Sequence, residues 1–149
     1  MTLKQKIYNY FLQALQEKIR RLQTVLIELK EIGSNETKST AGDKHETALA
    51  MLQIEQVNIH SQLNDLFEKK AVMKKINPDV ISTTVINGSL VSTNRGYLFL
   101  SIASGKAIIE GVSVTALSSR SPLGARLMGL STGGRAEVQN TAYIIESIT

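Results

Sequence analysis

Two acidic residues, Asp43 and Glu46, stand three positions apart directly before a run of regularly spaced apolar residues. This spacing is typical of a capping box, in which the first side chain accepts a hydrogen bond from a backbone N–H and the second reaches back to the helix start. Both carboxylates also suit the positive end of a helix dipole. A third acid, Glu36, lies a few residues earlier. By their spacing alone, the first two acids predict the start of a helix.

The other residues that could act in catalysis or bind a metal lack the partner residues that the common sites need. His45 and His60 are fifteen residues apart in a chain without cysteine, so we expect no zinc site. Ser119 and Ser121 have no histidine in the C-terminal half to activate them, which argues against a serine hydrolase. The glycine-rich stretch 129–134 lacks the lysine of a phosphate-binding loop. These patterns argue against a zinc site, a serine-hydrolase triad and a phosphate-binding loop.

Two predicted helices flank the acids. Residues from about 3 to 75 contain no proline, and their apolar residues recur at alternating intervals of four and three, the heptad pattern of a coiled coil. The polar stretch 32–42 predicts a loop, with Gly33 as the helix stop, and its length favours antiparallel neighbours. We therefore expect a coiled-coil hairpin over residues 1–77 with its tip at about 32–44. Its seam comprises Tyr8, Leu12, Leu15, Ile19, Leu22, Leu26 and Leu29, then His45, Leu49, Leu52, Gln56, Ile59, Leu63, Leu66, Lys70 and Met73.

The pattern changes at Asn77-Pro78, where proline should end the second helix. Residues 78–149 are predicted to form a small α+β domain of antiparallel strands. Its one short helix should begin at Ser121 as N-cap, with Pro122 at the first helical position and Gly129 at the stop. The expected strands are 80–86, 90–93, 97–103, 107–117, 136–139 and 142–148, with a tight turn near Asn140-Thr141.

Composition and charge indicate where the protein acts and which kind of surface it could bind. The chain has 149 residues, a formal charge of +4, no cysteine and no tryptophan. The absence of a signal peptide or of a long apolar run predicts a soluble, cytoplasmic protein. The positive charge is mild and spread along the chain, so it would favour an acidic surface without indicating direct DNA binding.

Two segments resemble the GreA/GreB family of bacterial transcript cleavage factors. Gly42-Asp43-Lys44-His45-Glu46-Thr47-Ala48 is similar to the GDLSENA motif at the coiled-coil tip of that family. Ser121-Pro122-Leu123-Gly124-x-x-Leu127-Met128-Gly129-x-x-x-Gly133 is similar to its C-terminal signature, which precedes a final strand pair in an FKBP-like domain. The two segments occur in the order that the family requires, so the resemblance extends over nearly the whole chain.

The resemblance implies a regulator of transcription elongation that binds core RNA polymerase and inserts its tip into the secondary channel. It implies that Asp43 and Glu46 act as catalytic acids lent to the polymerase, with Asp43 contacting a shared Mg²⁺. It also implies partner contacts at Glu36 and at Ser121, Pro122, Leu123 and Gly124. Mg²⁺ keeps most of its waters and needs only one or two carboxylates. The protein would then be an accessory factor, not an enzyme, with no cofactor of its own and only indirect contact with RNA and DNA. We expect a monomer.

Other interpretations of the same residues remain open. Asp43 and Glu46 can cap the helix instead of binding metal, and a capping carboxylate has fewer free lone pairs. The hairpin can serve as a scaffold or interaction arm without any role in transcript cleavage. A prolyl isomerase is suggested only by the FKBP-like fold, and Tyr97, Phe99 and Tyr143 are few aromatic residues for a proline pocket.

Overall fold

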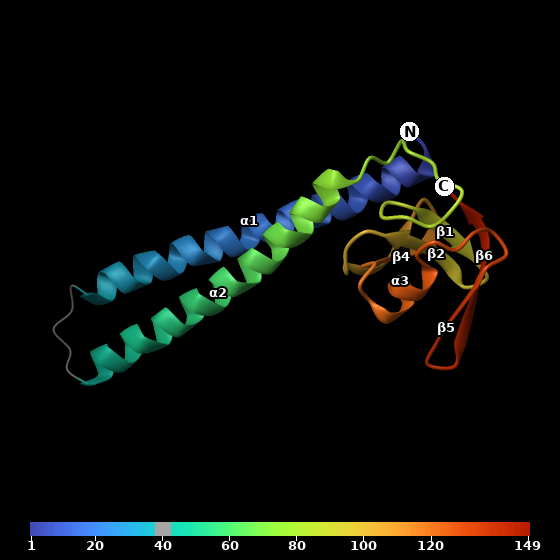
Figure 1. Ribbon diagram of the computed structural model, residues 1–149. Helices are drawn as coiled ribbons and strands as arrows, with labels where there is room; N and C mark the ends of the chain where they lie inside the picture. Colours follow the sequence, from blue (N-terminus) through green and yellow to red (C-terminus); the bar gives the residue numbers. More distant parts are fainter. Residues whose placement is uncertain (38–42) are drawn as a thin grey trace. The chain divides into compact units, whose positions relative to one another are not determined.

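The computed structural model describes residues 1–37 and 43–149, and the side chains of these residues except 36, 37 and 43–45. Two long helices come first, α1 (Leu3–Thr37) and α2 (Asp43–Lys75), and a short helix, α3 (Pro122–Leu127), follows the fourth strand (Figure 1). The strands are β1 (Leu90–Thr93), β2 (Gly96–Leu100), β3 (Gly105–Ile109), β4 (Val112–Leu117), β5 (Arg135–Val138) and β6 (Thr141–Ile148). The predicted α+β class, with a helical pair before a sheet and one short helix, is confirmed.

The chain packs as two compact units. One unit comprises residues 14–70, which are most of α1 and α2, and the other comprises residues 1–13 and 71–149. The second unit thus contains the first turns of α1 as well as the whole sheet. The predicted domain boundary at 77/78 stays a prediction, because units of packing do not show which segments fold alone.

In the unit 14–70, α1 and α2 run side by side in opposite directions (Figure 1). The seam predicted from the heptads is confirmed, since all of its described positions in this unit are buried or half-buried. Its centre is formed by the buried residues Leu15, Ile19, Leu26, Ile59, Leu63 and Leu66. The polar seam residues Gln56 and Lys70 are half-buried. None of the helices in the described part of the chain is apolar over enough of its length to cross a lipid bilayer.

The predicted helix stop at Gly33 is wrong, because α1 continues through this residue to Thr37. Glycine costs about 1 kcal/mol relative to alanine inside a helix. Helix propagation adds a hydrogen bond for every residue fixed, and here the neighbouring helix also supports α1, so one glycine does not end it. Residues 38–42 of the predicted loop lie outside the described residues.

Replacing Gly33 by Ala should stabilise the hairpin by about 0.5–1 kcal/mol, because the site is helical and has space for a methyl group. A Cβ built there would meet only Gln56 Nε2, at 4.0 Å. Urea denaturation followed by far-UV circular dichroism measures the change. A less stable G33A variant would show that this position requires glycine.

The six strands form one sheet in the order β3-β4-β2-β1-β6-β5. Neighbouring strands are antiparallel except for β2 and β4, which are parallel with Tyr97 opposite Val114 and Leu100 opposite Leu117. The sheet is therefore mixed, whereas the sequence predicted a purely antiparallel one. The difference arises because β3 turns back on β4 at the edge, so that β4 returns beside β2 in the same direction.

Three of the predicted strands differ in the structure, and one of them, 97–103, ends earlier, at Leu100. Residues 107–117 were expected as one strand but form the β3–β4 hairpin, because Glu110 and Gly111 both have positive φ, at 52° and 76°. Positive φ at both central residues is what the common two-residue hairpin turns need. Residues 80–86 form no strand. Val85 instead bonds with the turn after α3, donating to Leu130 O and accepting from Gly129 N.

The sheet is covered on both faces by residues of its own unit. Leu98 and Leu100 belong to a buried cluster with Leu127 of α3 and Ile145 of β6. Successive side chains of a strand point to opposite faces. Phe99 accordingly lies on the other face, where its ring stacks on Phe11 of α1 with centroids 6.3 Å apart. The first turns of α1 are thus part of the sheet's core.

Candidate functional site at the hairpin tip

The three predicted acids lie at the end of α1 and at the start of α2, on either side of residues 38–42. Asp43 is the first residue of α2, Glu46 follows one turn later, and Glu36 lies in the last turn of α1. The side chain of Glu46 is exposed, whereas those of Asp43 and Glu36 lie outside the described residues. The structure therefore places the backbone of all three acids near the tip, and both the capping and the metal-binding interpretation stay predictions.

Glu46 fits the ligand chemistry that the family resemblance implies. An exposed carboxylate can supply one oxygen to a Mg²⁺ ion that keeps its waters and takes further ligands from another protein. Within the described side chains, no group of three or more His, Asp or Glu could hold a metal ion. Glu46 is thus an exposed carboxylate outside any such group, and its role in metal binding stays a prediction.

An apolar hollow in the hairpin unit is lined by residues of both helices. Ile32 of α1 and Met51 of α2 are 48% and 63% exposed. Together with Ala48, Leu52 and Glu55 they line a cavity of about 320 Å³ in the hairpin unit. Exposed apolar side chains beside a carboxylate give the tip region a surface that can pack against another protein as well as carry charge.

The predicted residues of the C-terminal signature mainly build α3. Ser121 is the N-cap as predicted, since its Oγ accepts a hydrogen bond from Gly124 N at 3.0 Å and donates one to Ser118 O at 2.7 Å. Leu123 packs against the buried cluster of the sheet. Pro122 is exposed at the start of the helix. Of these predicted partner-binding residues, Pro122 presents the most exposed side chain.

Gly124 is required by its surroundings. A Cβ at this position would lie 2.0 Å from Ser118 O and 2.9 Å from Ser121 Oγ. The carbonyl of the preceding loop therefore occupies the space that any other side chain would fill. This close approach explains why the signature has a glycine here, independently of any partner.

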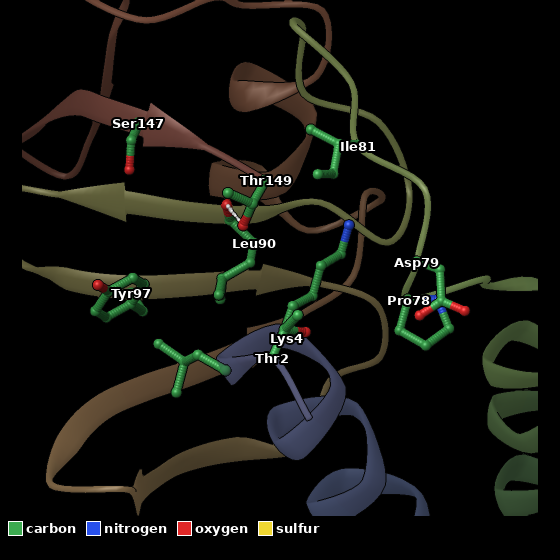
Figure 2. Close-up of a pocket in the computed structure, with 10 residues that line it drawn as sticks. Thr2, Lys4, Pro78, Asp79, Ile81, Leu90, Tyr97, Ser147 and Thr149 are labelled. Carbon is green, nitrogen blue, oxygen red and sulfur yellow. Dashed lines mark hydrogen bonds between the residues drawn. The ribbon is translucent and has the colours of Figure 1, made fainter.

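Sequence reasoning missed a second candidate site, around Lys4. A cavity of about 330 Å³ lies within the sheet unit and is lined by Lys4, Pro78, Asp79, Ile81 and Tyr97, among others (Figure 2). Lys4 is only 5% exposed, and its Nζ donates a hydrogen bond to Val80 O at 2.6 Å. Burial lowers the pKa of Lys4 from its usual value, and the charge of Asp79 opposes this shift.

A signal for this burial was present in the sequence. Lys4, Ile7 and Phe11 follow one another at intervals of three and four, so they share one face of the helix. Ile7 and Phe11 are 0% and 1% exposed. Because Lys4 shares this face with two buried apolar residues, it is expected to be buried as well. The heptad pattern, however, begins at Tyr8 and describes a different face of the helix.

Comparison with protein-family models finds no match, and comparison with curated proteins finds none either. Two solved structures are similar to the chain. One is the GreA factor homolog 1 (Gfh1) of Thermus thermophilus, at 14% identity and a TM-score of 0.38 over 93% of this chain and 94% of the other. The second is a structure of the transcription factor Gfh1, at 15% identity and a TM-score of 0.37 over 92% of each chain.

Proposed function

We propose that this protein regulates transcription elongation by binding bacterial core RNA polymerase and inserting its hairpin tip into the secondary channel. There Asp43 and Glu46 contribute carboxylates to a Mg²⁺ ion at the polymerase active centre, so that the polymerase cleaves backtracked RNA or is held in a modified state. The protein supplies ligands and the polymerase performs the chemistry.

The observation that carries the proposal is the position of Glu46. It is exposed in the first turn of α2, at the end of an antiparallel helical pair. The paired residues 14–37 of α1 alone would extend about 35 Å at 1.5 Å per residue. Two helices give a narrow element that can enter a channel, and a carboxylate at its end can reach a metal that a globular surface could not.

The two resembling segments support the same function. Residues 43–48 of the first segment lie at the start of α2, and the second segment spans α3 and the residues after it. These positions support the proposal, because the resemblance implies a tip motif beside a long helix and a signature that begins a short one. The mild positive charge of the chain would also favour association with an acidic protein surface.

Binding is tested by mixing the purified protein with bacterial core RNA polymerase at low salt and separating the complex by size-exclusion chromatography. We expect co-elution that weakens as salt is raised, because exposed charges are screened. Absence of co-elution at low salt would contradict the proposal as a whole.

The contribution of the tip acids is tested with the double variant Asp43→Asn/Glu46→Gln. Stimulated cleavage of RNA in a backtracked complex should fall on the order of 100-fold, because groups that stabilise transition-state charge contribute this much. Binding to core polymerase should change less than roughly threefold, since exposed charges contribute little to affinity. The measurement is the rate of RNA shortening in a gel assay.

A matched control is Glu68→Gln, which neutralises an exposed acid on the same helix far from the tip in sequence. This variant should stimulate cleavage by the polymerase as well as the wild type does. Equal loss in both variants would mean that overall charge matters and not the tip. Unchanged cleavage in the double variant would remove the acidic-tip mechanism.

A scaffold role is the second candidate, and a row of exposed apolar residues on α2 favours it. Met51, Ile54 and Val57 are 63%, 59% and 66% exposed, and they follow one another at intervals of three. Exposed apolar rows often mark surfaces for protein contacts. The polymerase-binding experiment distinguishes the two roles, since a scaffold for other proteins would not co-elute with core polymerase.

A further inference from the structure

The cavity around Lys4 has no part in the proposed action of the hairpin tip. It is formed by the first turn of α1, the segment after α2, strands β1 and β2 and the end of β6 (Figure 2). Its volume of about 330 Å³ is at the small end of the range for ligand pockets. All of these elements belong to one compact unit.

Within the described part of the chain, the ammonium group of Lys4 has a single protein acceptor and no paired carboxylate. Lysine has three N–H donors, and the hydrogen bond to Val80 O uses one of them. Among the residues that the structure describes, no carboxylate forms an ion pair with Lys4. Asp79 acts on it from a greater distance and accepts a hydrogen bond from Gln5 Nε2. Lys4 is therefore a buried cation that no described carboxylate neutralises, and the charge of an anion would complement it.

The burial of Lys4 costs stability. The pKa of Lys4 is lower in the folded protein than in the unfolded chain. At pH values between these two pKa values the unfolded chain binds more protons, so stability rises with pH. At pH values below the folded pKa, the full destabilisation by the buried charge is present. A buried, unpaired ammonium is expensive unless a partner charge arrives. Residues that lower stability are common at binding sites.

The walls define the kind of anion. Leu3, Pro78, Ile81, Leu90 and Tyr97 supply mainly apolar surface, and Thr2, Ser147 and Thr149 supply hydroxyl groups. Ile81 is 72% exposed, which marks a side that is open to solvent. An apolar cavity with one cationic donor matches a ligand with one negative group on an apolar body.

We propose that this cavity binds a small monocarboxylate with a short apolar group, whose carboxylate pairs with Lys4 Nζ. A phosphate fits less well, because a dianion would need several cationic or N–H donors, and among the described lining residues Lys4 is the only cation. The apolar walls would also contact nothing in an inorganic ion. The same carboxylate could be free in solution or be carried by a peptide end, and the structure favours the free acid because the cavity is small.

The test compares benzoate, benzamide, inorganic phosphate and a short peptide ending in phenylalanine as ligands of the full chain. Amide chemical shifts in ¹⁵N-labelled protein report the site and the affinity. We expect benzoate to perturb Leu90 and Tyr97 and to bind at least about tenfold more tightly than benzamide, because only benzoate can pair with the ammonium. Equal binding of benzoate and benzamide, or preferred binding of phosphate, would overturn the proposal. Tighter binding of the peptide than of benzoate would overturn the choice of a free acid.

Two variants test whether Lys4 is the cation that pairs with the carboxylate of benzoate. Lys4→Met keeps the length and the apolar stem, and it should abolish the preference for benzoate over benzamide. Asp79→Asn removes the acid at the exposed edge and should bind benzoate at least as tightly as the wild type, since a like charge is lost. Weaker binding by D79N would contradict the proposal even if K4M does not fold. Polymerase binding should be unaffected by benzoate, so failure here leaves the proposed function standing.

Discussion

Replacing Gly124 by Ala should destabilise the sheet unit by about 3 kcal/mol or more, a large effect for one methyl group. The added Cβ would lie 2.0 Å from Ser118 O and 2.9 Å from the Ser118 carbonyl carbon. Both are backbone atoms, so the strain cannot be relieved by moving one flexible side chain. Moving the loop would break the bonds of Ser121 to Ser118 O and Gly124 N, which together start α3.

Tyrosine fluorescence during urea denaturation measures this effect selectively. Tyr8, Tyr10, Tyr97 and Tyr143 all lie in residues 1–13 and 71–149, and the chain has no tryptophan. Gly33→Ala is the matched control, because the same chemical change in the other unit meets only Gln56 Nε2, at an ordinary contact distance of 4.0 Å. A G124A variant as stable as the wild type would mean that the loop at Ser118 moves freely.

Replacing Phe99 by Ala should cost about 3–5 kcal/mol, which is the usual range for a buried phenylalanine. Phe99 is 0% exposed and its ring stacks on Phe11, which is 1% exposed. The pair joins the first turns of α1 to β2, so its loss should loosen the base of the helix as well as the sheet. Thermal denaturation followed by circular dichroism checks the change.

Tyr10→Ala separates burial from aromatic contact. Tyr10 also meets the Phe11 ring, edge to face at 5.3 Å, but it is 46% exposed. Its removal should cost about 1 kcal/mol, since an aromatic contact contributes only this much beyond burial. Equal costs for F99A and Y10A would show that the contact and not the burial stabilises this region.

The helical pair could be predicted from sequence because heptad spacing is a local signal that repeats. Ser121 and α3 were predictable for a similar reason, as capping and proline at the first position act within one turn. The continuation of α1 through Gly33 was not predicted. A glycine within a helical pattern is a strong local signal for the end of the helix. The contacts with Gln56 and its neighbours on α2, which keep α1 helical, depend on the tertiary structure and cannot be seen in the local sequence.

The sheet was predicted less well. β-branched residues such as Val80 and Ile81 suggested a strand, but both are exposed, and strand formation depends on partners far along the chain. The parallel pairing of β2 with β4 depends on such partners too. The turn at Glu110 was not predicted, because glutamate rarely adopts the positive φ that Glu110 has here.

Of the candidate sites, the acids at 43 and 46 were visible as a motif, while the Lys4 cavity was not. The cavity needs residues from α1, β1, β2 and β6 together. No spacing within one segment reveals such an assembly, although the face shared by Lys4 and Phe11 indicates that Lys4 is buried.

Cross-linking from the tip tests the central claim most directly. The chain has no cysteine, so Glu46→Cys gives a single attachment point for a short photo-cross-linker, and Glu68→Cys gives the matched control on the same helix. With core RNA polymerase, we expect position 46 to cross-link to the subunit region that holds the catalytic Mg²⁺, and position 68 to miss it. A complex that forms without any cross-link from position 46 to the active centre would contradict insertion of the tip.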